Sequence, residues 1–219
     1  MLHFTSLSVR PFFPLVWTLS LICSALLLQS GCGGSGVQTS TIENTSKRTP
    51  KFTTVYKLLP KYIGENKAST PDKKVVLYWS EEQRKAHQLF VKEGKLVDFR
   101  GVLLDPHLED PKHQDRSGGA IYAMDIYGRI FFSFDHKYGT IHHSTLVGGD
   151  AIATAGEFFV QDGVLLSISN ASGHYRPPAS SLKRILDYFK QRGVKTDEVQ
   201  VFKIESDAPQ FHPYRLPRP

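Results

Sequence analysis

The stretch GEFFVQDGVLLSIS, residues 156–169, decides the fold. Apolar residues of the kinds enriched in strands lie on both sides of the dipeptide Asp162-Gly163. An Asp-Gly pair between two such runs is a strong signal for a two-residue turn, because both central positions of that turn need a positive φ angle. The sequence therefore predicts a β-hairpin that joins residues 156–161 to residues 164–169.

Two further hairpins are predicted upstream of this one. The first joins residues 87–92 to 96–99 through Glu93-Gly94, and the second joins residues 120–124 to 129–134 through Asp125-Ile126-Tyr127-Gly128. Each connection places a glycine where a tight turn needs one. Consecutive hairpins of this kind predict an antiparallel sheet.

Two segments predict helices. Ser80 precedes the first, with Gln83 in the capping-box position. The second follows Ser180 and Ser181, either of which could serve as its N-cap, and ends at Gly193. Its apolar stripe has spacings of three and four and consists of Leu182, Ile185, Leu186 and Phe189. With a final strand at residues 199–204, the predicted fold class is α+β: an antiparallel sheet built from consecutive hairpins, with one or two helices on one face.

The first 31 residues predict an export signal rather than part of the fold. They carry one charged residue, Arg10, followed by an apolar run at residues 12–28 and small residues at its end. The run is long enough to compete as a retained signal-anchor. Cleavage is favoured because Pro11 and Pro14 interrupt the segment and no basic cluster follows it.

The end of this segment, Leu28-Gln29-Ser30-Gly31-Cys32, resembles the bacterial lipoprotein signal. In that pattern a small residue precedes a cysteine that is acylated before cleavage; the usual leucine lies one position further back here, with Gln29 in its place. The resemblance implies lipidation at Cys32 and a cell-envelope location. Gly33, where an inner-membrane protein of this class carries Asp, implies the outer membrane or cell surface.

Composition predicts how the chain is divided into segments and which kinds of site it does not contain. The predicted parts are a signal at 1–31, a flexible tether at 32–50, a partly ordered extension at 51–73, the α+β domain at 74–206 and an extended tail at 207–219. The only other cysteine, Cys23, lies in the signal, so a processed chain would have no disulfide, zinc–thiolate site or catalytic thiol. The net charge of +6 is mild, and no basic run with aromatics predicts nucleic-acid binding.

Polar residues gather between positions 140 and 175, among segments that are otherwise core strands. The predicted ligand-binding residues are His142, His143, Ser144, Thr145, His174 and Tyr175. Glycines in the same region, with Gly173 among them, predict unusual backbone angles, and we expect the rings of His174 and Tyr175 to point outward at the rim of a pocket. A purely structural role, in which these groups satisfy the buried backbone, is the alternative.

Catalytic interpretations of the same residues stay open at this stage. A serine nucleophile would use Ser144 with His174 and Glu157, although no Gly-x-Ser-x-Gly elbow surrounds Ser144. An ADP-ribosyltransferase-like site on a nucleotide or glycosyl substrate would use a His-Ser-Thr strand, an aromatic residue and Glu157, with His143 as a further catalytic candidate. A metal at His142 or His143 with His174 would lack a third ligand, so we predict neither a metal nor a cofactor. Residues 104–119 form a long polar connection, interpreted as a solvated loop in preference to a lid.

The stretch IHHSTLVGGDAIATAGEFFVQDGVLLSISNASGHYRP, residues 141–177, resembles the C-terminal domain of plant IQ-motif-containing, calmodulin-binding proteins and its bacterial and fungal relatives. The similarity extends over residues 75–201. In the plant proteins calmodulin binds an IQ helix of the type Ile-Gln-x-x-x-Arg-Gly-x-x-x-Arg; nothing similar occurs here, so calmodulin is not an expected partner. Thr145 and Glu157 depart from the family pattern, and plant members often have Arg at the second position, which argues against a catalytic carboxylate. The sequence thus predicts an exported binding module with an unassigned ligand or protein partner, and an enzyme as the alternative.

Overall fold

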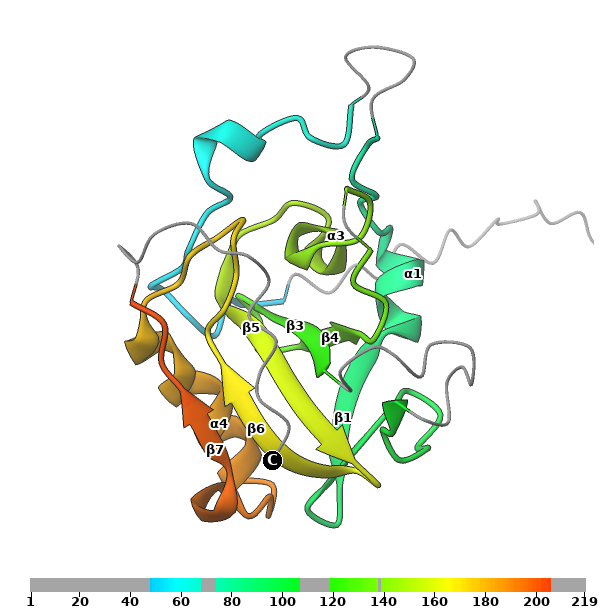
Figure 1. Cartoon of the computed structure of the whole chain (residues 1–219), viewed down its shortest axis with the longest axis vertical. Helices are drawn as coiled ribbons and strands as arrows, with labels where there is room; N and C mark the ends of the chain where they lie inside the picture. Colours follow the sequence, from blue (N-terminus) through cyan, green and yellow to red (C-terminus); the bar gives the residue numbers. More distant parts are fainter. Residues whose placement is uncertain (1–47, 68–73, 107–118, 138, 206–219) are drawn as a thin grey trace, which may run out of the picture. The chain divides into compact units, whose positions relative to one another are not determined.

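A seven-stranded sheet forms the centre of the computed structural model (Figure 1). The structure describes residues 48–67, 74–106, 119–137 and 139–205. The strand order is β2-β1-β4-β3-β5-β6-β7. The strands are β1 (Gln88–Lys92), β2 (Lys95–Val97), β3 (Gly119–Asp125), β4 (Ile130–Ser133), β5 (Ile152–Gln161), β6 (Val164–Ser169) and β7 (Gln200–Phe202). The α+β class is confirmed.

All three predicted hairpins are present, and turn chemistry explains two of them. Asp162 and Gly163 have φ angles of 47° and 73°, and Glu93 and Gly94 have 52° and 75°. Positive φ at both central residues matches the twist of the flanking strands. The β3–β4 hairpin turns at Gly128, where φ is 83°.

The last strand departs from the prediction of a fully antiparallel sheet. β7 pairs with β6 in parallel, with Ile168 opposite Val201. The reason is the helix α4 (Leu182–Lys190), which carries the chain back along the sheet between the two strands. A crossover through a helix returns the chain in the same direction, whereas a tight turn reverses it.

Capping was predicted correctly at one helix and incorrectly at the other. At α1 (Glu81–Ala86), Ser80 Oγ accepts from Gln83 N at 3.3 Å and Gln83 Oε1 accepts from Ser80 N at 2.9 Å. A short 3₁₀ turn, η3 (Ala179–Ser181), precedes α4, and no serine side chain caps that helix. The Ser181 hydroxyl instead lies 2.9 Å from Thr154 Oγ1, buried against β5.

A further helix, α3 (His143–Val147), was not predicted. It corrects the expectation of a His-Ser-Thr strand, and it also places helices on both faces of the sheet rather than on one. On one face, Leu146 and Val147 of α3 pack with Ile121 and Ala123 of β3. On the other face, a larger core combines α4 with alternate residues of β3 and with residues of all three hairpins. Its members include Tyr122, Met124, Phe132, Phe158, Ile185 and Phe189.

The sheet curls, so that strands far apart in its order come into contact. Leu96 N donates to Gly163 O at 2.7 Å, and Gly163 N donates to Leu104 O at 2.9 Å, so the β2 edge reaches the β5–β6 turn. Two more 3₁₀ turns, η1 (Pro60–Tyr62) and η4 (Thr196–Glu198), complete the described elements. None of the helices in the described ranges is long and apolar enough to cross a membrane.

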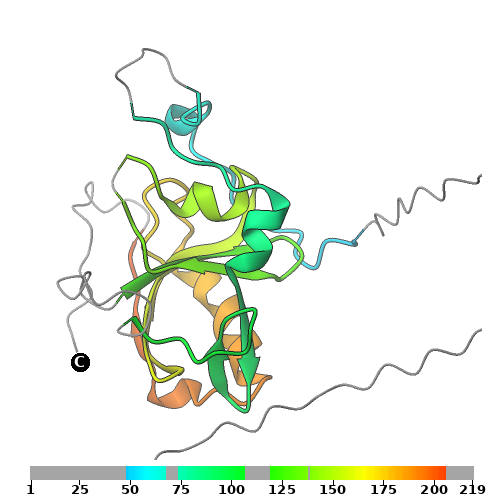
Figure 2. The same cartoon turned by 90° about the vertical axis from the view of Figure 1, so that its right-hand side faces the viewer.

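An N-terminal arm, residues 48–67, packs against the domain (Figures 1 and 2). Tyr56 N donates to Ile152 O at 2.8 Å and Ile152 N donates to Tyr56 O at 3.0 Å, which adds a bridge at the start of β5. In both views the cyan arm runs toward the end of the sheet where α3 lies. The signal, most of the predicted tether and the tail lie outside the described residues, as do positions 107–118 of the long polar connection.

Replacing Gly156 should test the tightest backbone approach in the sheet. A Cβ at this position would overlap the carbonyl oxygen of Ser169, so we expect Gly156→Ala to lower the free energy of unfolding by about 3 kcal/mol. That corresponds to a fall of roughly 6–12 °C in the thermal midpoint. The matched control is Gly173→Ala, since a Cβ there meets no atom within 4 Å. Equal midpoints for the two variants would contradict this account.

Candidate functional site

The predicted polar residues converge on a residue that sequence reasoning missed, Glu65 of the N-terminal arm. Its Oε2 lies 3.0 Å from His174 Nε2, and the Tyr78 hydroxyl donates to its Oε1 at 3.4 Å. Ser144 also lies close enough to lower the pKa of Glu65. We call Glu65, Tyr78, His142, Ser144 and His174 the polar cluster.

His174 is held from two sides. Its carbonyl accepts from Leu59 N of the arm at 3.0 Å, and the Tyr62 ring centroid lies 4.1 Å from that of the imidazole. The turn that carries His174 closes through Arg176 N and Ser172 O at 2.8 Å. Gly173 does not have a positive φ angle, so the expectation of an unusual angle there is wrong. The residue of this turn that takes the left-handed conformation is Arg176, with φ of 46°.

His142 joins the cluster through ring contacts. It is the N-cap of α3, and its ring centroid lies 4.5 Å from that of His174. Gly139 N donates to His142 Nε2 at 3.1 Å, and His142 Nδ1 lies 3.4 Å from His136 Nε2. An Nε2 that accepts fits a neutral imidazole with its proton on Nδ1.

The pKa of the Glu65 carboxyl and the pKa values of the His142 and His143 imidazoles are all lowered, for different reasons. Burial alone would raise the pKa of Glu65, but the hydrogen bond from His174, the nearby Ser144 hydroxyl and the charges of His174 and His142 lower that pKa overall. Burial, followed by repulsion from His174 and His136, lowers the pKa of His142 to about 4. Burial likewise places the pKa of His143 well below its usual value. The polar cluster therefore pairs an ionised Glu65 carboxylate with a neutral His142 ring near pH 7.

Three predicted ligand residues make hydrogen bonds that serve the fold. His143 Nε2 lies 2.9 Å from Gly156 O, and Thr145 Oγ1 accepts from His142 N at 3.0 Å. The Tyr175 hydroxyl donates to Asp150 O at 2.8 Å. Tyr175 is 3% exposed and His174 is 9% exposed, so the expectation that both rings point outward is wrong.

Ser144 and Glu157 do not form the predicted catalytic set with His174. Ser144 Oγ is buried and has no hydrogen-bond partner of normal length among the described residues. Glu157 lies on β5, where burial raises the pKa of its carboxyl to about 7, and no contact among those residues joins that carboxylate to the polar cluster. His174 Nε2 faces Glu65 instead.

The polar cluster can bind through hydrogen bonds, although it is largely buried: the side chains of His174 and Glu65 are 11% and 10% exposed, and Tyr78 is half-buried. No group of three or more His, Cys, Asp or Glu residues in the described ranges is arranged to hold a metal ion. Glu65 gave little signal in the sequence, because Pro60 and Gly64 interrupt the pattern around it.

Residues 83–182 match the family model described as the IQ motif-containing protein middle domain. The domain is related to plant IQ-motif proteins. The expected relation is thus confirmed, and the matching part is the middle domain rather than the C-terminal one. The match covers α1 through the start of α4, and it includes the cluster members His142, Ser144 and His174 but not Glu65 or Tyr78.

Several curated plant proteins are similar to the chain. IQ domain-containing protein IQM3 of Arabidopsis thaliana is 29% identical over 153 residues, which are 69% of this chain and 32% of that protein. IQ domain-containing protein IQM1 of the same plant is 24% identical over 149 residues, 68% of this chain and 29% of that protein. The chain therefore spans about a third of the length of these relatives. No solved structure matches it.

Stability should fall as the pH is lowered from about 6.5 toward 4. Because the pKa of His142 is about 4 in the folded chain and 6.5 when unperturbed, the unfolded chain binds a proton in this range that the folded chain does not. The stabilisation is complete above pH 6.5, and its loss amounts to about 3 kcal/mol once the pH falls below 4. Urea unfolding measured at several pH values gives the slope.

The control is His142→Gln, which keeps a side-chain acceptor for Gly139 N and does not titrate. His143 is unchanged in both proteins, so the difference between the two slopes reports His142. Parallel pH profiles would contradict the assignment.

Proposed function

We propose that this chain is a bacterial cell-envelope lipoprotein that presents a binding module outside the cytoplasm. In this proposal residues 1–31 direct export, acylated Cys32 anchors the chain in the outer membrane or at the cell surface, and residues 32–50 form the tether. The support is the run of small residues around Cys32 after a long apolar segment, followed by glycine-rich sequence. More than one acyl chain gives a stable anchor.

The observation that carries binding over catalysis is the geometry of the polar cluster. His174 Nε2 faces the Glu65 carboxylate at 3.0 Å, while the Ser144 hydroxyl has no hydrogen-bond partner in the part of the chain that the structure describes. A serine nucleophile needs its histidine base within hydrogen-bond reach, and His174 Nε2 is directed at Glu65 instead. The relation to the IQ motif-containing protein middle domain supports an interaction module as well.

The partners of this module follow from the same residues. A ligand or protein partner would contact the least buried members of the polar cluster, Glu65, Tyr78 and His174. The rest of the predicted set, His142, His143, Ser144, Thr145 and Tyr175, is buried beside them. The membrane is a partner through Cys32 alone. We propose neither nucleic acid nor calmodulin, since the sequence has no aromatic-interleaved basic run and no IQ pattern.

Anchoring depends on the sulfur of Cys32 and can be tested by replacing this residue with serine. We expect the parent chain to begin at an acylated Cys32, whereas Cys32→Ser, which lacks the acyl acceptor and therefore the cleavage that follows acylation, should keep residues 1–31 and carry no acyl group. Fractionation, followed by mass spectrometry of the N-terminus, gives the answer. A parent chain that stays in the membrane with residues 1–31 attached and Cys32 unmodified would establish a signal-anchor instead.

Catalysis on a nicotinamide nucleotide is the specific alternative, and it can be measured directly. We expect no release of nicotinamide from NAD⁺ by the purified chain above the level given by Glu157→Gln, since the Glu157 carboxylate has no contact with the cluster. Chromatographic separation of nicotinamide is the measurement. Release that disappears in both Glu157→Gln and Ser144→Ala would overturn the binding-module proposal.

A further inference from the structure

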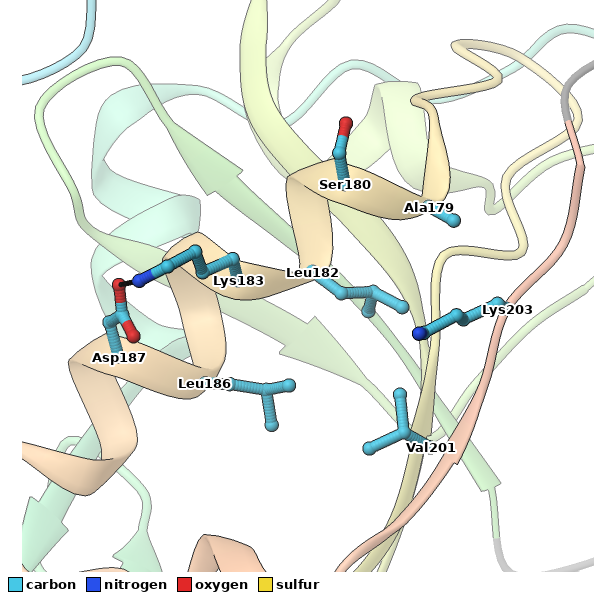
Figure 3. A pocket seen from close by; sticks show the side chains of 8 residues that line it. All are labelled: Ala179, Ser180, Leu182, Lys183, Leu186, Asp187, Val201 and Lys203. Atoms are coloured by element: carbon cyan, nitrogen blue, oxygen red, sulfur yellow. Dashed lines mark hydrogen bonds and ion pairs between the residues drawn. The ribbon is translucent and has the colours of Figure 1, made fainter.

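A groove lies between α4 and β7, away from the polar cluster. It has a volume of about 380 Å³ and is lined by Ala179, Ser180, Leu182, Lys183, Leu186, Asp187, Val201 and Lys203 (Figure 3). The crossover explains why it exists: α4 covers the sheet obliquely, and β7 returns beside β6 at the edge of the sheet, so helix and strand form two walls. Its size lies at the lower end of the range for small-molecule sites.

The floor of the groove is apolar. Leu182, Leu186 and Val201 extend their side chains into it from the two walls (Figure 3). Leu182 belongs to the buried core, and Leu186 and Val201 are partly buried against that core. The floor thus combines the buried Leu182 with the partly exposed Leu186 and Val201, and an apolar chain can cover the exposed part.

The charges at the rim are not equivalent. Lys183 and Asp187 form an ion pair at 2.6 Å on the outer face of α4. Lys203 projects from the opposite wall with its ammonium toward the groove (Figure 3), and it makes no ion pair or hydrogen bond among the described residues. The groove therefore offers one uncompensated positive charge beside an apolar floor.

Buried hydrogen bonds hold the backbone that carries Lys203. The side-chain amide of Asn170 donates to Ile204 O at 2.8 Å, and Ile204 N donates to Asn170 Oδ1 at 2.8 Å. The same amide also donates to Pro177 O at 2.8 Å. Asn170 is 2% exposed, so this clamp fixes the strand end next to Lys203 before any ligand arrives.

We propose that the α4–β7 groove binds an apolar chain that ends in a carboxylate, such as a medium-length fatty acid. The hydrocarbon lies over Leu182, Leu186 and Val201, and the carboxylate meets the Lys203 ammonium. An ammonium–carboxylate contact at the edge of an apolar surface fixes the polarity of the ligand. This inference deepens the proposed function as a binding module, and it depends neither on Cys32 nor on the polar cluster.

Decanoate is the probe. The protein is the Cys32→Ser chain without residues 1–31, since the described residues, which begin at position 48, belong to one compact unit and export is then not needed. We expect decanoate to bind with a dissociation constant of roughly 0.1 mM and to shift the amide resonances of Leu182, Leu186 and Val201. Decyltrimethylammonium, with the same chain and the opposite charge, should bind at least tenfold more weakly.

Matched lysine variants locate the charge. Lys203→Met should weaken decanoate at least tenfold, whereas Lys195→Met should not, because Lys195 lies outside the groove lining and pairs with Glu198. Thermal midpoints of both variants should equal that of the parent, which separates lost binding from lost folding.

Three results would overturn the proposal: resonance shifts outside the groove, equal binding of the cationic amphiphile, or equal affinity in Lys203→Met. Binding of acetyl-leucyl-leucine without binding of decanoate would also overturn it, and would assign the groove to peptide termini. Each of these results would leave the anchoring and nicotinamide measurements unaffected, so failure here is distinguishable from failure of the proposed function.

Discussion

The close approach of Gly156 to Ser169 is the constraint on which the rest of the structure depends. A side chain at position 156 would overlap the Ser169 carbonyl oxygen, so β5 and β6 can approach each other this closely only because residue 156 is glycine. The Ser169 carbonyl accepts from the Tyr122 hydroxyl at 2.9 Å, and the Gly156 carbonyl lies 2.9 Å from His143 Nε2. This backbone contact links three strands and α3. β5 and β6 meet at it, the Ser169 carbonyl accepts from β3, and the Gly156 carbonyl lies beside the imidazole of α3.

The segment that follows Ser169 links both candidate binding regions. Asn170, the next residue, clamps the end of β7 and thereby shapes one wall of the α4–β7 groove. Four residues later His174 meets Glu65 and brings the N-terminal arm onto the domain. The groove and the polar cluster therefore both depend on residues 170–177, and a substitution that shifts the backbone of this segment would change the geometry of both.

The arm belongs to the folded unit although the family match begins only at residue 83. Arg184 of α4 donates to Thr54 O at 2.7 Å, and its guanidinium lies 5.4 Å from the Tyr56 ring centroid. Glu65 provides the partner that a buried His174 needs, since a polar ring left unpaired in the interior would cost stability. A carboxylate from outside the matched region thus completes the cluster that the matched region begins.

The sequence by itself determined the local structure and the family relation. Asp162-Gly163 and Glu93-Gly94 adopt the positive φ angles that two-residue hairpins require, and Ser80 with Gln83 forms the expected capping box, because each signal acts over a few residues. The relation to IQ motif-containing proteins followed from a continuous run of residues.

Tertiary structure alone decided the rest. The five residues of α3 are too few to form a stable helix alone, so the cap at Thr145 and the left-handed Gly148 did not suffice to predict it, and packing on β3 decided its conformation. The direction of β7 came from the crossover through α4, and the meeting of Glu65 with His174 came from folding segments that lie far apart in the chain. Turn and cap signals are local, whereas burial and pairing depend on which distant groups share the same space.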